Sequence, residues 1–551
     1  MTTTINIKSF FLITVASLFS LLSFAQKGRG DTTKRQTIDI TSSYKPVLRN
    51  AVKINFSATH LNADTSKSVG AYNIPAQNLF YTYQPVSLRP LAITQDSVLD
   101  LGLRNFLKVG FGNYSTPYVS AGFSFGDGKT SLLNVYADYV SSKGTAIRYQ
   151  DYSLMNIKAA GSYFTEKNEL YGSASIRQQD NYLYGYNHLA YNFSKNDLLQ
   201  RFQNINLTAG FRNKTINETG INYNPNIDIN IFSNQNKVTE NSLAATVPVE
   251  KTFADAFTIK ASAKAAITTY TSKNLVTNVK LNNNIYSIAP ELIYAKPLFN
   301  IHAGVTPAWD NGKLTVFPNI YGEAKLQDKI FLVQAGYVGR FIKNNFQYLS
   351  SVNPYLQTVS IQQNTKETEL YGGIKATLGS HFNFSAKASW IVYNNLPFFI
   401  NDTADGKTFT INNESKVYDF RIHGDMGFIS QDKFTITGGL TFNGYNGMKD
   451  NNRAWGTIPV ELNASLRWWA FKQVLIKSDF MAFSGGAFLL KDGSDIKLGG
   501  GTDLSAGLEF AINKKFSAWL DINNIFNNKY QRWNAYPVYG LNILAGAIIK
   551  F

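Results

Sequence analysis

The sequence predicts an all-β protein: a transmembrane antiparallel β-barrel of about 22 strands, preceded by a mostly extended N-terminal segment. Three observations lead to this prediction. Segments in which apolar and polar residues alternate recur from about Phe106 to the end of the chain, and a period of two is that of a strand. No helical pattern separates these segments. Their connections alternate between short polar turns and longer loops.

Residues 1–25 have the pattern of a signal peptide. Lys8 precedes the apolar stretch FFLITVASLFSLLSFA, and Ser23-Phe24-Ala25 is a small-x-small cleavage site before Gln26. The apolar run is short for a membrane span and contains three Ser. We therefore expect the protein to be exported, with a mature chain that begins at or near Gln26.

Residues 26–105 differ from the rest of the chain because they contain scattered Pro, an excess of basic residues and only brief alternation. We expect this segment to be mostly extended and to depend on a surface against which it can pack. The prediction is that residues 36–104 fill the barrel lumen. The alternative is an unstructured leader in the periplasm.

Residues 106–551 are predicted to form the barrel itself. Turns such as TEKN, LQDK, SQDK and INKK are short, whereas the loops that contain NHLAYNFSKNDLLQR, NNLPFFINDTADGKTFTINNESK and NGYNGMKDNNRAWG are long. Short turns on one rim and long loops on the other are typical of an outer-membrane barrel, with the short turns in the periplasm. Counting hairpins back from the C-terminus gives about 22 strands, or two fewer if the NKTINETG and NYSTPY hairpins are absent.

The strands alternate between a face for lipid and a face for the lumen. The last strand is predicted to guide membrane insertion, and its apolar face carries Tyr539, Leu541, Ile543, Ala545, Ala547, Ile549 and Phe551. Charged residues on the opposite faces of the strands are expected to line the lumen as a largely acidic wall. They are Asp138, Arg177, Asp419, Arg421, Asp425, Asp479, Asp503, Glu509 and Asp521.

The composition argues against several classes of function. The chain has no Cys, so disulfides, thiolate metal sites and cysteine nucleophiles are excluded. The formal net charge is +16, but the basic residues are scattered, and nucleic acid is therefore not an expected partner. The five His do not stand at metal-ligand spacing, and the acidic turns NDTADGK and KDGSDIK lack the spacing of a calcium loop. We predict no catalytic, cofactor-binding or metal site, and no enzymatic activity.

The end of the chain resembles that of TonB-dependent receptors. In that family an Asn-Leu-Phe-Asn-like motif, a Tyr and a Tyr-Pro pair precede a last strand that ends on Phe. The matching residues here are Asn524, Ile525, Phe526, Asn527, Tyr530, Trp533, Tyr536, Pro537 and Phe551. The departure comes at PVYGLN, where Tyr539 and Leu541 stand in place of a Pro and an Arg. The resemblance implies a barrel of about 22 strands. Because no TonB box precedes a folded plug, the chain looks like a plug-less relative of these receptors.

Two functional hypotheses follow. The leading one is a non-enzymatic barrel in the outer membrane of a Gram-negative bacterium that serves as a subunit of a larger complex, in contact with outer-membrane lipids and with outer-membrane or surface lipoproteins. The alternative is a transporter or channel for a nutrient, closed by its N-terminal segment or by a partner lipoprotein. A barrel of about 22 strands has a lumen wide enough to need filling, so the N-terminal segment, inward side chains or another protein must close it.

Overall fold

A computed structural model describes residues 105–551, with the exception of 216–217, 254–255, 274–277, 327–330, 380 and 431–432. The predicted signal peptide and the predicted lumen-filling segment lie outside these residues. The described chain forms one large antiparallel sheet in which every strand pairs with the next and β1 pairs with β29. Two short segments, β7 and β8, lie end to end along β9 and count as one strand. The result is a closed barrel of 22 strands, which confirms the predicted fold class.

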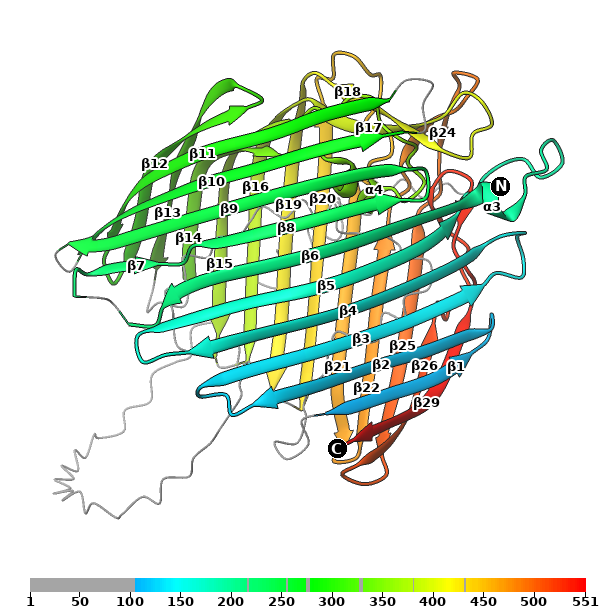
Figure 1. Cartoon of the computed structure of the whole chain (residues 1–551), viewed down its shortest axis with the longest axis horizontal. Coiled ribbons are helices and arrows are strands. Elements are labelled where there is room, and N and C mark those ends of the chain that lie inside the picture. The colour runs from blue at the N-terminus through cyan, green and yellow to red at the C-terminus, as the bar shows by residue number, and fades with distance from the viewer. Residues whose placement is uncertain are drawn as a thin grey trace, which may run out of the picture. The chain divides into compact units, whose positions relative to one another are not determined.

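Figure 1 shows the strands slanting around the closed wall. Those of the barrel are β1 (Phe106–Gly112), β2 (Thr116–Gly126), β3 (Ser131–Lys143), β4 (Asp151–Phe164), β5 (Asn168–Tyr182), β6 (Leu199–Asn213), β7 (Ile221–Tyr223), β8 (Asn226–Asn234), β9 (Val238–Phe253), β10 (Phe257–Ser272), β11 (Val279–Ala295), β12 (Phe299–Asp310), β13 (Lys313–Leu326), β14 (Phe331–Ile342), β15 (Thr365–Leu378), β16 (Phe382–Asn394), β19 (Val417–Ser430), β20 (Phe434–Asn446), β21 (Val460–Phe471), β22 (Val474–Phe483), β25 (Gly501–Ala511), β26 (Phe516–Asn523) and β29 (Asn542–Lys550).

The connections contain smaller elements of their own. They are the helices α3 (Lys195–Leu198) and α4 (Phe346–Val352) and three two-stranded sheets. The sheets are made of β17 (Leu396–Asn401) with β18 (Phe409–Glu414), β23 (Ala487–Leu489) with β24 (Asp495–Lys497), and β27 (Gln531–Trp533) with β28 (Tyr536–Pro537). Within the described residues, no helix has the length and apolar character needed to cross a membrane.

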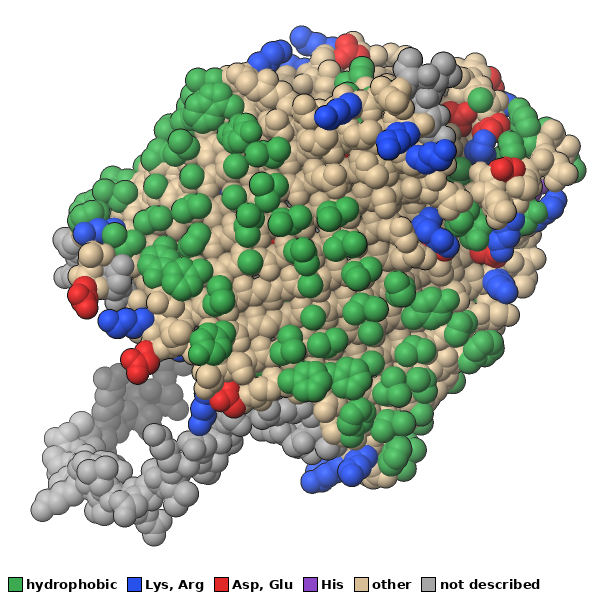
Figure 2. Space-filling model, in the orientation of Figure 1, with side chains coloured by type: hydrophobic (Ala, Val, Ile, Leu, Met, Phe, Trp, Pro, Cys, Tyr) green, Lys and Arg blue, Asp and Glu red, His purple; other side chains and the backbone are tan. Residues whose placement is uncertain are grey.

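The period-two pattern places apolar side chains on the outside of the wall. On β25, for example, Leu508 and Phe510 are each more than 40% exposed, while Asp503 and Ser505 of the opposite face are buried. Figure 2 shows hydrophobic side chains spread over the outer surface of the strands, with charged side chains concentrated at the two ends. An exposed apolar surface of this extent on a closed barrel is suited to lipid. The protein is thus an outer-membrane β-barrel.

The two rims of the barrel differ. The turns TEKN and INKK lie at the rim where the C-terminus lies, and the strand ends on either side of LQDK and SQDK lie at the same rim. The long loops join strands at the other rim. By the rule for outer-membrane barrels, the rim with short turns faces the periplasm and the rim with long loops faces the cell exterior. α4, β17, β18 and β24 gather at the extracellular end (Figure 1).

The seam between the first and last strands is packed around one inward-facing tryptophan. The Trp519 indole N–H donates to the carbonyl of Val109 at 3.1 Å, and its ring lies against Gly110, where a Cβ would come within 2.2 Å of it. Lys108 lies over the same ring at 3.9 Å and beside Asp521 at 3.5 Å. Gly546 of β29 faces Gly110 in the register. These close approaches require glycine on both strands, and they let the ring cover the closure.

Candidate functional site: a folded layer across the extracellular mouth

Seven extracellular loops fold together into a single structure, which we call the mouth layer. It consists of residues 144–150, 183–198, 343–364, 395–416, 447–459, 484–500 and 524–541. Buried aromatic and aliphatic side chains from most of these loops, with a few from the wall, form the largest hydrophobic core of the described chain. Loops of a membrane barrel could project separately into water, but these bury an apolar core of their own, which holds them in place.

The loop 343–364 crosses the lumen. It joins the neighbouring strands β14 and β15, yet its helix α4 packs against strands β8, β9 and β10, which lie several strands away around the wall. The Phe346 ring is fully buried, with its centre 6.0 Å from that of Phe232 on β8 and 5.6 Å from that of Tyr270 on β10. The helix is therefore held by strands β8, β9 and β10 and not only by the two strands that its loop joins.

A buried carboxylate fixes the start of α4. Glu240 of β9 faces the lumen and is completely shielded from solvent. Its two oxygens accept four hydrogen bonds, all from the loop: from the N–H groups of Phe346 (2.7 Å) and Gln347 (3.0 Å), and from the side-chain amides of Asn345 (2.8 Å) and Gln362 (3.0 Å). Since the first N–H groups of a helix have no partner within the helix, the carboxylate satisfies donors that would otherwise be buried and unpaired.

Three tyrosines from three different loops meet in the middle of the layer. The rings of Tyr355 and Tyr536 are stacked with centres 3.4 Å apart, and Tyr184 packs edge-on against Tyr536 at 4.9 Å. Trp533 and Phe409 extend this group at 5.4 Å from each other. Aromatic pairs of this kind stabilise a core beyond the area that they bury. The cluster joins loops that lie on separate sides of the barrel.

The hydroxyl groups of these tyrosines remain protonated and donate hydrogen bonds. Burial raises the pKa of Tyr184 to about 12 and also raises the pKa values of Tyr355 and Tyr536. The Tyr184 hydroxyl donates to the carbonyl of Pro537 at 3.0 Å, and the Tyr536 hydroxyl donates to the carbonyl of Lys407. Each of these bonds links two loops, so the polar contacts reinforce the packing.

Main-chain hydrogen bonds also pass from loop to loop. The N–H of Phe409 donates to Tyr355, and the N–H of Gln357 donates to Phe409, each at 3.0 Å. Leu356 and Phe409 thereby form a parallel bridge between loops 343–364 and 395–416. From the wall, the Gln200 side chain donates to the carbonyl of Leu356 at 3.0 Å. The layer is thus tied by backbone as well as by side chains.

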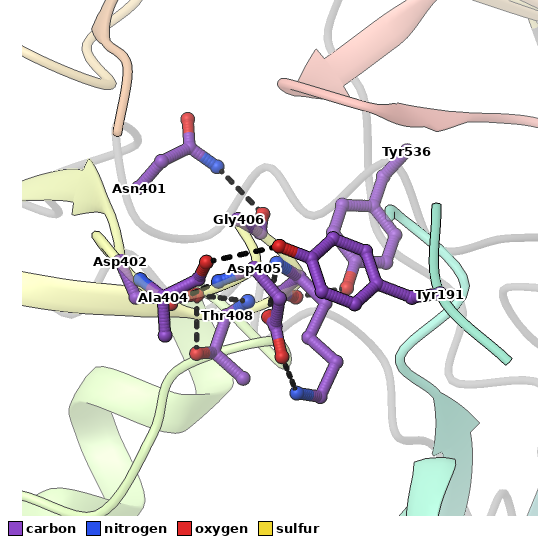
Figure 3. A network of polar contacts seen from close by, with 9 residues as sticks. Tyr191, Asn401, Asp402, Ala404, Asp405, Gly406, Thr408 and Tyr536 are labelled. Carbon is purple, nitrogen blue, oxygen red and sulfur yellow. Dashed lines mark hydrogen bonds and ion pairs between the residues drawn. The ribbon is translucent and has the colours of Figure 1, made fainter. Parts of the chain in front are cut away.

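Figure 3 shows the turn at the tip of the β17–β18 hairpin, where Asp402 organises the backbone. Its carboxylate accepts hydrogen bonds from the N–H groups of Ala404 (2.9 Å), Asp405 (3.2 Å) and Thr408 (2.9 Å), and from the Thr408 hydroxyl (2.8 Å). Burial raises the pKa of Asp402, but these hydrogen bonds outweigh it and leave the pKa below its ordinary value. The Asp402 carboxylate of the acidic turn NDTADGK is therefore engaged by hydrogen bonds within the turn itself.

The C-terminal motif takes part in the layer. Asn524 and Asn527 have positive φ angles of 49° and 51° and shape the loop after β26. Asn524 donates to the carbonyls of Asn528 and Tyr539, and Asn527 accepts from the N–H of Leu541. Of the other motif residues, Tyr530 donates to Asp503 at 3.1 Å, Trp533 and Tyr536 lie in the core, the carbonyl of Pro537 accepts a hydrogen bond from Tyr184, and Phe526 is 52% exposed. The sequence pointed to these residues through the resemblance, but not to the layer that they help to build.

The last strand differs from expectation at one residue. Ile543, Ala545, Ala547 and Phe551 are exposed on the outer face, and Leu541 and Ile549 are partly exposed. Tyr539, in contrast, precedes β29, is 4% exposed, and donates its hydroxyl to the carbonyl of Gln150 within the layer. The predicted alternation was extended too far toward the N-terminus, because the strand begins only at Asn542.

The predicted lumen charges all have polar partners on the wall itself. Ion pairs join Asp419 to Arg421 (2.9 Å), Asp479 to Arg467 (3.1 Å), Asp521 to Lys108 (3.5 Å) and Glu509 to both Lys477 and Lys550 (3.7 Å each). Hydrogen bonds join Asp425, Asp138, Arg177 and Asp503 to His423, Asn156, Gln179 and Ser505, respectively. The structure adds Glu240, Glu291, Glu367 and Glu369, which are buried on inward faces. Their alternation with apolar residues could have revealed them.

The described residues contain no group of three or more His, Cys, Asp or Glu side chains that could hold a metal ion. No protein-family model matches the sequence, and no curated protein is significantly similar to it. Solved structures, however, share its fold.

Three of these structures are transport proteins or receptors. The FrpB iron transporter from Neisseria meningitidis has a TM-score of 0.63 at 10% identity, over 81% of each chain. A mutant of the ferric enterobactin receptor PfeA from Pseudomonas aeruginosa, in complex with enterobactin, has a TM-score of 0.62 at 12% identity, over 81% of each chain. The siderophore receptor PirA from Acinetobacter baumannii has a TM-score of 0.61 at 10% identity, over 81% of this chain and 80% of that one. The resemblance to TonB-dependent receptors is thus confirmed for the barrel fold. Whether a plug is present depends on residues 1–104, which the structure does not describe.

Proposed function

We propose that this protein carries a nutrient across the outer membrane and that the mouth layer is the gate at its extracellular end. The observation that carries the proposal is a closed 22-strand barrel whose own loops pack together across its mouth, with loop 343–364 also packed against the wall strands β8, β9 and β10. A wide lumen has to be closed whatever the function of the barrel. A closure built from the barrel's own surface loops supports transport in particular, because loops can open and close around a substrate.

The fold comparison supports the same choice. The sequence alone favoured a subunit of a larger complex, with a nutrient transporter as the alternative. The similar structures bear the titles iron transporter, ferric enterobactin receptor and siderophore receptor, and these titles support the alternative. Lipoprotein partners stay a prediction, and the transported nutrient is not defined by the fold.

The N-terminal part of the chain completes the proposal. We propose that residues 1–25 direct export and are removed, and that residues 36–104 lie within the lumen below the mouth layer. In this arrangement the layer would close the extracellular side and the N-terminal segment the periplasmic side. Protease protection of residues 36–104 in outer membranes opened only on the periplasmic side would support this, and rapid cleavage there would contradict it.

A reversible lock of the mouth layer tests transport. Because the chain has no Cys, a pair introduced by Gln357→Cys and Thr410→Cys, one residue beyond the bridge between Leu356 and Phe409, would contain the only thiols. Cells with the gene, without it, and with the Cys pair are grown in a defined medium, and depletion of each solute is followed by mass spectrometry.

Transport predicts that at least one solute is depleted more slowly without the gene. The Cys pair should restore its depletion when reduced and not when oxidised. Equal depletion of every solute with and without the gene would contradict transport. Stable proteins that co-purify with the barrel in mild detergent, in the absence of any effect on depletion, would favour the structural subunit.

A further inference from the structure

An aromatic and basic patch lies on the outside of the mouth layer, where four of its loops converge. We define the patch by Arg148, Tyr149, Tyr191, Phe193, Lys407 and Lys491. Figure 2 shows Lys and Arg side chains gathered with hydrophobic and a few acidic side chains at the end of the barrel where α3 lies. The patch lies on the exterior side of the layer, and its three partly buried rings, Tyr149, Tyr191 and Phe193, pack against the core.

The rings of the patch are held in fixed orientations. Tyr191 and Phe193 are nearly parallel, with an angle of 13° between their planes and centres 5.9 Å apart. The Tyr191 hydroxyl lies 3.4 Å from the carbonyl of Ala404, to which it donates, so the ring is tied to the hairpin tip beneath it (Figure 3). Lys407 covers the Phe193 ring at 4.4 Å and is itself paired with Asp405. The charge of Lys407 is therefore already balanced by a carboxylate of the layer.

The other two cations of the patch, Arg148 and Lys491, have no such carboxylate partner among the described residues. Arg148 lies 4.5 Å above the Tyr149 ring, and Lys491 lies 5.7 Å above the Tyr191 ring. Both are exposed, and in the described part of the chain no carboxylate lies within ion-pair distance of either. Arg148 is oriented by bonds to the Asn192 side chain (3.2 Å) and the Tyr149 hydroxyl (2.5 Å), which leave most of its donors available.

The backbone at Tyr149 is strained. Its φ angle is +65°, in the left-handed region that a bulky residue rarely adopts. Such a conformation persists only where the surroundings enforce it, and it occurs often at binding sites. Here it places the Tyr149 ring beneath the guanidinium of Arg148. The strain therefore supports a patch that is organised before any ligand arrives.

We propose that this patch binds acidic oligosaccharides, sugar chains that carry carboxylate or sulfate groups. The faces of aromatic rings are electron-rich and attract the C–H groups on the flat face of a sugar ring. Arg148 and Lys491 supply donors for the acidic substituents, and an arginine fork matches a carboxylate in particular. Each of these cations lies over an aromatic ring, so the patch offers a charge and a ring face together, which suits a ligand whose acidic groups are attached to flat, hydroxylated rings. The inference goes beyond the proposed transport and does not depend on it, because binding on the outer face requires no passage through the barrel.

Binding is measured by calorimetry on the full-length protein in detergent, with three probes of matched length. A hexamer of galacturonic acid tests the proposal, maltohexaose lacks its charge, and hexaglutamate lacks its sugar rings. The acidic sugar should bind best, and its affinity should fall as salt is raised because exposed charges are screened. Tyr191→Ala, Arg148→Ala and Lys491→Ala should each weaken binding by about tenfold, the effect of losing one charged hydrogen bond or ring contact.

The matched control is Lys313→Ala, which removes an exposed cation from the β12–β13 turn on another part of the same rim and should leave the affinity unchanged. Each variant is first checked for the β-sheet spectrum and heat resistance of the wild type. Equal binding of hexaglutamate would show that charge alone is recognised, and equal binding of maltohexaose that the cations are irrelevant. Either result, or no binding of the acidic sugar, would overturn the proposal.

Discussion

The contact between Glu240 and α4 gives the sharpest prediction about the mouth layer. In Glu240→Gln the side chain keeps its shape, but one acceptor oxygen becomes an amide that donates. Each oxygen of Glu240 now accepts two hydrogen bonds from the loop 343–364. Two of the four hydrogen bonds are therefore lost. The two loop groups that donated them now face the amide N–H of Gln, which is itself a donor. At about 1.5–3 kcal/mol for each hydrogen bond to a charged group, the change should weaken the docking of the loop by about 3–6 kcal/mol.

A change of this size is large enough to see without unfolding the barrel. It corresponds to an increase of roughly a hundredfold or more in the population of molecules with the loop detached. Amide hydrogen exchange of α4 and of the segment around Gln362, followed by mass spectrometry, should accelerate by a similar factor. Exchange in β9, which stays paired with β10, should remain slow.

Glu250→Gln provides a matched control. Glu250 lies on the same face of the same strand. It accepts a hydrogen bond from Asn222 of β7 at 3.2 Å and not from the loop 343–364. This variant should leave exchange in α4 unchanged. Equal exchange in the Glu240→Gln variant and the wild type would refute the idea that the carboxylate holds the layer, whatever the behaviour of the control.

Three further predictions concern the wall and the hairpin tip. Ile549→Asp, which places a charge on the lipid-facing side, should lower heat-resistant insertion, at a cost below the roughly 2–4 kcal/mol of a basic residue at the bilayer midplane, while Lys550→Gln should insert; similar yields of both in the outer membrane would show that the register of the last strand is wrong. Gly546→Ala places a Cβ 1.9 Å from the carbonyl of Val109 and should open the seam, whereas Gly372→Ala meets no atom within 4 Å and should be neutral; equal thermal stability of the two would contradict the packing at the seam. Because the pKa of Asp402 is lowered in the folded protein, its stabilising effect should be complete above the ordinary aspartate pKa and disappear as pH falls through the lowered value. The wild type should therefore lose its advantage over Asp402→Asn in acid, and a constant difference in melting temperature at all pH values would argue against this.

These predictions together separate two parts of the protein with different roles. The wall is stabilised by continuous strand pairing, and its outer face meets lipid. The mouth layer is stabilised by apolar clusters and polar contacts between its loops instead of by continuous strand pairing, so a change such as Glu240→Gln, which removes the hydrogen bonds that hold one loop to the wall, can loosen it. A segment that must move during transport is expected to come from the less stable part of a structure.

The sequence by itself determined the wall. Period two, hairpin turns and the contrast between short and long connections are local features, and a strand needs only its immediate neighbour to show which face is apolar. Leu508 and Phe510 could therefore be placed on the outside, and the number of strands could be counted. The exception, Tyr539, lies where the alternation in the sequence already runs before the strand itself begins at Asn542.

Only the tertiary structure decided what lies across the mouth. Tyr184, Tyr355 and Tyr536 belong to three loops that are far apart in the chain, and nothing in the sequence near any of them specifies the other two. Likewise, Glu240 is one polar residue among many on inward faces, and its role depends on a helix that begins 106 residues later. The layer exists because closure of the barrel brings these loops to one end, where they can bury a shared apolar core, and that proximity is a property of the closed wall.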